Sequence, residues 1–371
     1  MASQFNADQI GSFLRPIGVK EARVKFKMGE IDEEVLTMVE DSAVLGALDR
    51  QKQAGVDIYS DGEFRRSGFQ WDLIEAVEGY VDTELPVVER MWQGGTGEEQ
   101  PERQGTTQAV GARLKQFRRL TETQTTFLRE HAPGPFKMTV PSANQFPTLG
   151  FQPGLTDRFY SGRSELLWDI AGIIKAAIAA LADERVPYIQ VDAPRYAYYV
   201  DPKWRQHLVE LGEDPDALLA EAVQADAFCF DAALGSSATT ALHVCRGNNQ
   251  SMWYAQGGYE PIAEQLFANI KVDRLLLEYD SERSGSFEPL RFVRPETVVV
   301  LGLVSTKEAA LEDQEDLLRR IDEASKYVPL ERLALSPQCG FASTEAGNVL
   351  TEDEQWRKLE LVVETARKVW G

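Results

Sequence analysis

Eight short apolar segments alternate with helical patterns along the chain, and this alternation limits the fold more than any other feature. The segments cover residues 7–13, 56–61, 136–141, 186–192, 241–245, 275–280, 297–302 and 333–339. Strands that alternate with helices indicate a parallel sheet, and a count of eight favours a closed barrel. We therefore expect an α/β fold of the (β/α)₈ TIM-barrel class, with residues 1–371 forming one catalytic domain.

One stretch breaks the rhythm of strands and helices. Gly94-Gly-Thr-Gly97 and the charged tract 98–104 indicate an excursion without a core of its own. We expect a hairpin-like insertion at about residues 80–110, after the second strand, and then a helix over about 111–131. Near the other end, Thr351-Glu-Asp-Glu354 has the form of a capping box and predicts the start of a terminal helix.

The net charge and the cysteine content indicate which binding partners and which cellular compartment are compatible with this chain. The 371 residues include 59 acidic and 39 basic side chains, a net charge of −20 that argues against nucleic acid or an anionic membrane as a partner. No run approaches the about 18 apolar residues of a membrane span, and the N-terminus lacks the basic and apolar regions of a secretory signal. Three cysteines make no disulfide framework. We expect a cytoplasmic protein with reduced thiols; the composition does not exclude a homo-oligomer.

The residues with the most useful chemistry fall at or just past the C-terminal ends of the predicted strands. They are Ser12, Glu63, Asp192, His243, Cys245, Glu278 and Cys339. In a (β/α)₈ barrel these strand ends form one rim, where active sites are built. Residues far apart in the sequence are therefore expected to become neighbours.

Four of these residues form a candidate metal site. His243 and Cys245 are two positions apart on one strand and so point to the same side, while Glu278 and Cys339 end two later strands. A mixed set of nitrogen, sulfur and oxygen donors suits Zn²⁺ better than Mg²⁺ or Ca²⁺. The spacing alone is equally compatible with buried core cysteines and a hydrogen-bonded core histidine.

Six motifs resemble, in their order, those of the cobalamin-independent methionine synthase family. They are Ile10-Gly-Ser-Phe13, Asp61-Gly-Glu-Phe-Arg-Arg66, Ile189-Gln-Val-Asp192, His243-Val-Cys245, Glu278 and Ser336-Pro-Gln-Cys-Gly340. The chain is most similar to the short members that contain only the catalytic barrel. The resemblance implies a catalytic zinc held by His243, Cys245, Glu278 and Cys339, and methyl transfer to a thiol, typically homocysteine.

The resemblance also implies how the thiol substrate is bound. Glu63 and Asp192 match the residues that hold the homocysteine amine, and two carboxylates are suited to an ammonium group. Ile10, Gly11 and Ser12 match the segment that holds the α-carboxylate. For Glu63 the alternative is a salt bridge with Arg65 or Arg66.

The sequence departs from the family where the methyl donor is expected. Tyr198 stands in the place of a glutamate that contacts the pterin, and Lys307 falls nearest the position of a histidine thought to donate a proton. A lysine could do this only with a lowered pKa. No counterpart of the Gly-Ser-Arg folate-binding stretch is recognisable in residues 85–135, so the donor need not be a polyglutamyl folate.

Three hypotheses follow for the activity. The first is a zinc-dependent methyltransferase that acts on homocysteine with a methyl donor. The second is a zinc-dependent thiol alkyltransferase or lyase that acts on an epoxide or another small electrophile. The third is a non-enzymatic barrel in which zinc is structural. Glu63 and Asp192 favour an amino-acid thiol, because two carboxylates would repel a sulfonate.

Overall fold

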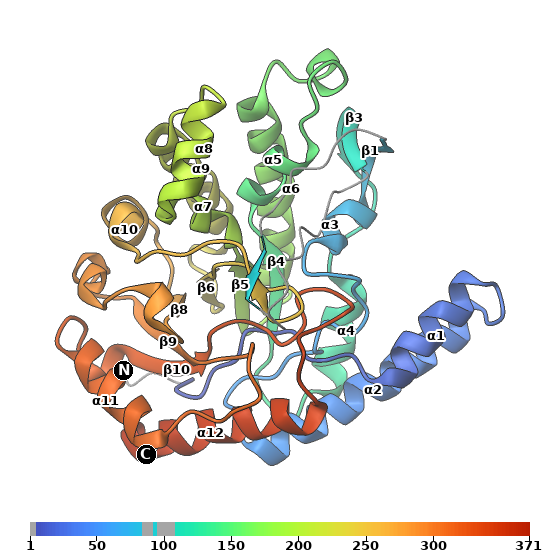
Figure 1. The fold of residues 1–371 in the computed structure, drawn as a ribbon. Coiled ribbons are helices and arrows are strands. Elements are labelled where there is room, and N and C mark those ends of the chain that lie inside the picture. Colours follow the sequence, from blue (N-terminus) through green and yellow to red (C-terminus); the bar gives the residue numbers. More distant parts are fainter. Residues whose placement is uncertain (1–4, 84–91, 95–107) are drawn as a thin grey trace.

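Six parallel strands form the centre of the protein in the computed structural model, which describes residues 5–83, 92–94 and 108–371. In sheet order they are β4 (Lys137–Pro141), β5 (Tyr188–Asp192), β6 (Thr239–Val244), β8 (Arg274–Glu278), β9 (Val298–Val304) and β10 (Leu333–Pro337). Each strand of this sheet is parallel to its neighbours. The strands lie in the middle of the molecule with helices around them (Figure 1).

Two further segments join the edges of the sheet and close the barrel. Ala7 forms a parallel bridge with Leu335 of β10, and Tyr59 forms one with Phe136, the residue before β4. The two segments also meet each other, through the parallel bridge between Ser12 and Gly62. The expected barrel is therefore confirmed, with its first two strands reduced to isolated bridges.

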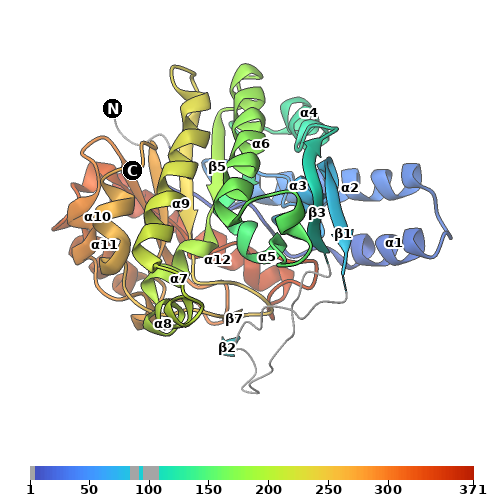
Figure 2. The same cartoon turned by 90° about the horizontal axis from the view of Figure 1, so that it is seen from above.

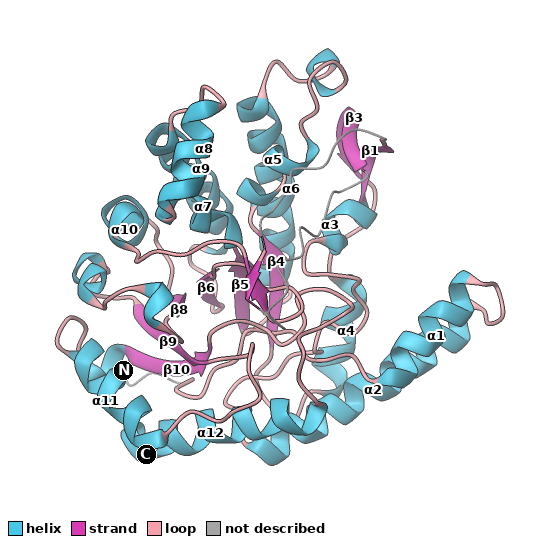
Figure 3. Cartoon of the chain, in the orientation of Figure 1, coloured by secondary structure: helices cyan, strands magenta, loops and turns pink. Residues whose placement is uncertain are grey.

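The helices cover the outside of the strands (Figures 2 and 3). Their bounds are α1 Ile17–Lys27, α2 Glu33–Ala54, α3 Trp71–Ala76, α4 Glu122–His131, α5 Pro147–Gly150, α6 Arg163–Asp183, α7 Ala197–Val200, α8 Pro202–Glu210, α9 Pro215–Phe230, α10 Glu260–Phe267, α11 Gln314–Ser325 and α12 Glu352–Trp370. The capping box expected before α12 is present: Thr351 Oγ1 accepts from Glu354 N at 3.2 Å, and Glu354 Oε2 accepts from Thr351 N at 2.8 Å. None of the helices in the described ranges is long and apolar enough to span a membrane.

The insertion after the second segment contains an antiparallel pair, β1 (Val77–Asp82) with β3 (Gln108–Gln116). A second small pair joins β2 (Gln93–Gly94) to β7 (Met252–Trp253). The hairpin-like insertion is thus confirmed, although residues 84–91 and 95–107, including the whole charged tract 98–104, lie outside the described residues. The helix expected over 111–131 is wrong in its first part, because residues 111–116 belong to strand β3 and α4 begins only at Glu122. That the whole chain is one domain remains a prediction.

The interior of the barrel has an apolar layer and a charged layer. Ile58, Tyr188, Ala241, Leu276 and Val300 belong to one buried cluster inside the strands. Beside it, Asp8 pairs with Lys137 at 2.7 Å and with Arg274 at 3.4 Å. Buried charges persist only when they are paired in this way.

Candidate metal centre and substrate cavity

Three potential metal ligands meet at the C-terminal rim of the barrel. His243 lies on β6, Cys245 follows that strand directly, and Cys339 follows β10. Their donor atoms all lie within 4.8 Å of one another, and all three residues are buried. The alternation of side chains along β6 brings His243 and Cys245 to one side, and closure of the barrel brings Cys339 to them.

The local chemistry of this His-Cys-Cys group fits a metal. His243 Nδ1 lies 3.3 Å from the carbonyl oxygen of Leu276, and the buried ring also contacts the thiol of Cys339. A ring that donates through Nδ1 leaves the Nε2 lone pair free for a metal ion. The hydrogen bond with Cys245, together with burial, raises the pKa of the Cys339 thiol well above its usual value. Two adjacent buried thiols and an imidazole nitrogen are a donor set that Zn²⁺ prefers.

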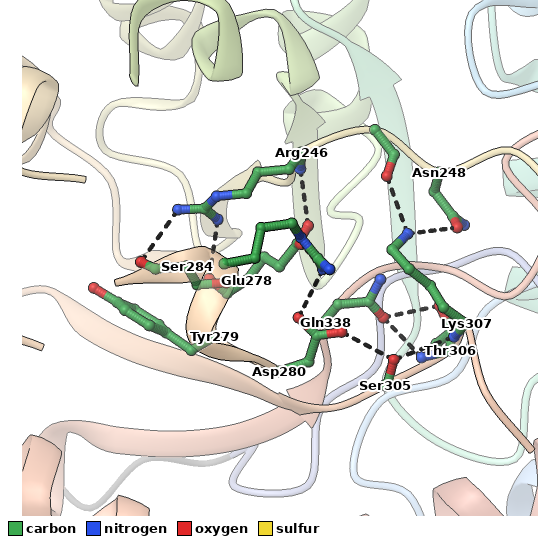
Figure 4. A network of polar contacts seen from close by, with 12 residues as sticks. Arg246, Asn248, Glu278, Tyr279, Asp280, Ser284, Ser305, Thr306, Lys307 and Gln338 are labelled. Atoms are coloured by element: carbon green, nitrogen blue, oxygen red, sulfur yellow. Dashed lines mark hydrogen bonds and ion pairs between the residues drawn. The ribbon is translucent and has the colours of Figure 1, made fainter. Parts of the chain in front are cut away.

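Glu278, the fourth expected ligand, is close by but does not join this group. It is fully buried at the end of β8. Its Oε2 accepts a hydrogen bond from the backbone N–H of Arg246 at 2.8 Å, and its Oε1 accepts one from Arg283 at 2.7 Å. Figure 4 shows the contact between the Glu278 carboxylate and the backbone nitrogen of Arg246. Burial would raise the pKa of Glu278, but the positive charge of Arg283, followed by Lys307 and Arg246, outweighs burial and lowers it.

A cavity of about 100 Å³ opens beside the three donors. Its lining includes all three of them together with four of the residues expected to bind substrate, Ile10, Ser12, Glu63 and Asp192. The closed barrel therefore brings together side chains from segments that are more than three hundred residues apart in the sequence.

Glu63 and Asp192 are buried and face the same cavity. Glu63 Oε1 accepts a hydrogen bond from Thr139 Oγ1 at 2.9 Å, whereas Glu63 Oε2 has no partner among the described residues. The alternative salt bridge exists in part, since Arg66 Nη1 lies 3.6 Å from Glu63 Oε1. Burial raises the pKa of Asp192 to about 6, and the charge of Glu63 adds to this effect. The two carboxylates thus repel each other across a space suited to a cation.

Three other expected site residues do not line the cavity. Gly11 supports it from behind: its φ is +135°, and an added Cβ would lie 3.0 Å from Thr139 Cγ2. Tyr198 stacks on Trp204 with ring centroids 4.0 Å apart. Lys307 Nζ donates to the carbonyl oxygen of Gly247 and to Asn248 Oδ1, both at 3.0 Å (Figure 4).

The structure adds residues to the site that the sequence did not indicate. They come from loops and from the short 3₁₀ helix Ala143–Gln145, and include Trp92, Gln145, Asn248, Asn249, Ser343 and Thr344. Asn248 is the best anchored of these, since its Nδ2 donates to the carbonyl oxygen of Gly340 at 2.8 Å. Its position just after the His243-Val-Cys245 strand end was the one signal that could have indicated it.

Comparison with known proteins identifies the family. Residues 5–368 match the model of the cobalamin-independent synthase catalytic domain. The chain belongs to this family. The resemblance expected from the six motifs is therefore confirmed, and the barrel is the fold of the family's catalytic domain.

Relatives in the cobalamin-independent synthase family span nearly the whole chain. The chain is 38% identical over 371 residues to the uncharacterized protein YxjH of Bacillus subtilis (strain 168), covering 99% of this chain and 95% of that protein. It is 23% identical over 362 residues to a methionine synthase of Saccharolobus solfataricus, covering 97% and 93%.

Two solved structures have a similar fold. One is a putative vitamin-B12-independent methionine synthase from Listeria monocytogenes, with a TM-score of 0.73, 28% identity and coverage of 100% of this chain and 99% of that chain. The other is a B12-independent methionine synthase from Shewanella sp. W3-18-1 in complex with selenomethionine, with a TM-score of 0.73, 20% identity and coverage of 99% and 98%. At 20% identity the second comparison shows the fold alone.

Proposed function

We propose that this member of the cobalamin-independent synthase family is a zinc-dependent methyltransferase that methylates the thiol of homocysteine to give methionine. One observation carries the proposal: a His-Cys-Cys donor group and two buried carboxylates line the same cavity. A relative named methionine synthase supports the choice of substrate.

His243, Cys245 and Cys339 are the residues that would hold the zinc, and Glu278, at the end of the neighbouring strand β8, is the expected fourth ligand. Bound zinc keeps a substrate thiol deprotonated near neutral pH, which makes the sulfur a nucleophile. The Leu276 carbonyl oxygen, 3.3 Å from Nδ1, helps to fix the orientation of the His243 ring, whose donor atom lies within 4.8 Å of both cysteine sulfurs. With zinc bound, the thiolates of Cys245 and Cys339 would neutralise the charge of the metal, so that the sulfur of a substrate would stay electron-rich.

The amino-acid part of the substrate would be held by the opposite wall of the cavity. Glu63 and Asp192 bind the α-ammonium group, and Asp192, with a pKa of about 6, is largely ionised at neutral pH. Ser12 and the backbone of Ile10, which line the cavity, would bind the α-carboxylate, and Gly11 would support this segment from behind. A thiol with a sulfonate in place of the ammonium would meet two negative charges here, and this disfavours the alternative of a sulfonate thiol as acceptor.

The part of the site that would bind the methyl donor is less well defined than the part that would bind homocysteine. Lys307 holds Gly247 and Asn248 in the cavity wall, and it would have to leave these acceptors to donate a proton to a leaving group. Tyr198 supports the wall through Tyr254, to which its ring lies edge-on with centroids 5.4 Å apart. We therefore assign both residues supporting roles and leave the methyl donor open to a folate, a corrinoid or a smaller methyl compound.

Metal analysis combined with zinc-edge spectroscopy tests this proposal. The purified protein should contain one zinc, and a sulfur atom from added homocysteine should enter its coordination shell. Cys339→Ser should lose both the zinc and the response to thiol. Cys229→Ser is the matched control, because Cys229 is buried in α9 with its thiol directed to the Ala171 carbonyl oxygen at 3.4 Å. Zinc that ignores every thiol tested would favour a structural metal, and entry of a different thiol would favour an alkyltransferase.

A further inference from the structure

Arg15 is a buried arginine that joins two loops of the cavity wall. Its side chain donates from Nη2 to the carbonyl oxygens of Glu63 and Arg66, both at 3.0 Å. From Nη1 it donates to the carbonyl oxygens of Ala342 and Thr344, at 2.6 and 3.3 Å. The first two residues belong to the loop after the second strand segment, and the last two belong to the loop after β10. One guanidinium group therefore connects the two loops.

The two loops carry opposite ends of the proposed substrate site. Glu63, to which we assign the ammonium group, is held by Arg15 through its own carbonyl oxygen. Ala342 lies three residues after Cys339, which belongs to the group of metal donors. Both Glu63 and Cys339 line the cavity. Arg15 thus links the ammonium end of the cavity to its metal end.

Glu63 needs support of this kind because its backbone is strained. Its φ is +58°, and a residue in such a conformation persists only where its surroundings hold it. The start of the loop is fixed where Phe13 N donates to the carbonyl oxygen of Gly62 at 3.1 Å. The Glu63 carbonyl oxygen also accepts from Arg66 N at 3.1 Å, but this bond lies within the loop. Arg15 ties the same oxygen to a different part of the barrel.

The chemistry of the guanidinium group suits this connection. Burial lowers the pKa of Arg15 to about 10, although the negative charge of Glu63 opposes the shift, so the group stays protonated at neutral pH. Charged donors make stronger hydrogen bonds than neutral ones. The planar group also presents its nitrogen atoms in a rigid fork, which fixes the acceptors on its two sides relative to each other.

We propose that Arg15 is a positioning residue that sets the spacing between Glu63 and the metal donors, and thereby the length of the amino-acid thiol that the cavity accepts. The proposal rests on the function proposed above, in which the metal binds the sulfur and Glu63 binds the ammonium group. Cysteine has one methylene fewer than homocysteine between these two groups. It is therefore too short to reach both ends of a site whose length fits homocysteine.

The Kd values of the zinc-loaded, full-length protein for homocysteine and cysteine, measured by calorimetry, test this role. Wild type should bind homocysteine at least about tenfold more tightly, since one methylene changes binding by about 10- to 200-fold. In Arg15→Met the homocysteine Kd should rise about tenfold, because Glu63 no longer meets the ammonium group. The cysteine Kd should stay the same, since cysteine does not use that contact. An equal rise for both thiols, or no change for either, would overturn the proposal.

Arg15→Lys separates position from charge. A lysine keeps a positive charge near Glu63, but its single nitrogen atom cannot connect the two loops as the guanidinium fork does. We expect this variant to lose the preference for homocysteine as Arg15→Met does. A lysine variant with the wild-type preference would show that the charge alone suffices, and this would also overturn the proposal.

Arg332→Met is the matched control. Arg332 also donates to two backbone carbonyl oxygens, those of Arg294 and Thr297 at 3.1 and 3.4 Å, but it lies at the N-terminal ends of β9 and β10. Its replacement should leave both Kd values unchanged.

The wild-type measurement distinguishes failure of this proposal from failure of the proposed function. Zinc-loaded wild type that binds neither thiol would refute the function itself. Wild type that binds homocysteine and cysteine equally well would leave thiol binding intact and refute the role of Arg15 alone. This comparison needs no variant, so it does not depend on whether Arg15→Met folds.

Discussion

Gln190 donates from one amide nitrogen to both Asp192 Oδ1 and the carbonyl oxygen of Ile10, each at 2.7 Å. Its orientation is fixed from the other side, where Lys137 Nζ donates to Gln190 Oε1 at 2.9 Å. A lysine ammonium is a donor only, so the amide oxygen must face Lys137 and the amide nitrogen must face the site. The Gln190 side chain therefore positions both Asp192, which we propose binds the ammonium group of homocysteine, and the Ile10 backbone, which we propose binds its carboxylate.

Replacing this amide should weaken substrate binding without affecting the metal. Gln190→Met has a similar volume but leaves Asp192 without its 2.7 Å donor. A hydrogen bond to a charged group contributes about 1.5–3 kcal/mol, so we expect the homocysteine Kd of the zinc-loaded protein to rise about tenfold or more. Isothermal titration calorimetry measures this change, and zinc content should stay at the wild-type level.

Gln51→Met is the matched control for Gln190→Met. Gln51 is a fully buried amide on α2 that donates to the carbonyl oxygens of Ala47 and Ser60, at 3.1 and 2.9 Å. Its loss should lower the melting temperature without changing the homocysteine Kd. Equal effects of the two variants on binding would mean that Gln190 acts through general stability alone.

Much of the site could be predicted because it depends on strand periodicity and strand polarity. His243 and Cys245 share a side of β6 by the two-residue repeat, and Cys339 and Asp192 follow the rule that functional residues gather at the C-terminal ends of barrel strands. Once the barrel fold is recognised, both rules can be applied to each strand from its own sequence alone. They place the donors correctly although the strands are far apart in sequence.

The rest depends on contacts that no local pattern contains. The direction of the Glu278 carboxylate is decided by Arg246 and Arg283, which come from two different loops. Residues 111–116 belong to β3 and not to the expected helix, because their partner strand β1 ends about 25 residues earlier in the sequence and no local pattern in 111–116 records that pairing. Asn248 likewise becomes a wall residue through its bond to the Gly340 carbonyl oxygen.

We expect Glu63 to lower the stability of the folded protein and to contribute to homocysteine binding. It is buried beside Asp192, one of its oxygens has no partner in the described structure, and its φ of +58° is unfavourable for a residue with a side chain. Glu63→Gln removes the repulsion between the carboxylates and keeps the acceptor for Thr139. We expect a higher melting temperature and a homocysteine Kd raised at least about tenfold. A lower melting temperature together with unchanged binding would contradict both assignments.

Lys307 should act by holding the loop after β6. Its Nζ bonds to Gly247 and Asn248 keep Asn248 in the cavity wall. Lys307→Met should therefore weaken homocysteine binding about threefold to tenfold, because two hydrogen bonds of roughly 1 kcal/mol each no longer fix the loop. Lys307→Arg can donate to the same acceptors and should recover part of the affinity. Wild-type affinity in the methionine variant would show that the loop does not need this lysine.

Asp226 should make the protein less stable as the pH rises. This carboxyl is fully buried on α9, where it accepts from Ser142 Oγ and Tyr196 OH, both at 2.8 Å. Burial raises its pKa from 3.8 to about 6 in spite of these bonds. The folded protein therefore binds the proton more tightly than the unfolded chain does, and the resulting stabilisation is complete below pH 3.8 and lost as the pH rises through about 6.

The shift at Asp226 corresponds to about 3 kcal/mol between the two limits. Asp226→Asn cannot titrate, so the free energy of unfolding of wild type relative to this variant should fall by about that amount between roughly pH 4 and pH 7. Urea denaturation of both zinc-loaded proteins across this range measures the difference. If the difference in free energy of unfolding between the two proteins does not change with pH, the pKa of Asp226 is the same in the folded and unfolded states. The hydrogen bonds from Ser142 and Tyr196 would then fully cancel the effect of burial on this pKa.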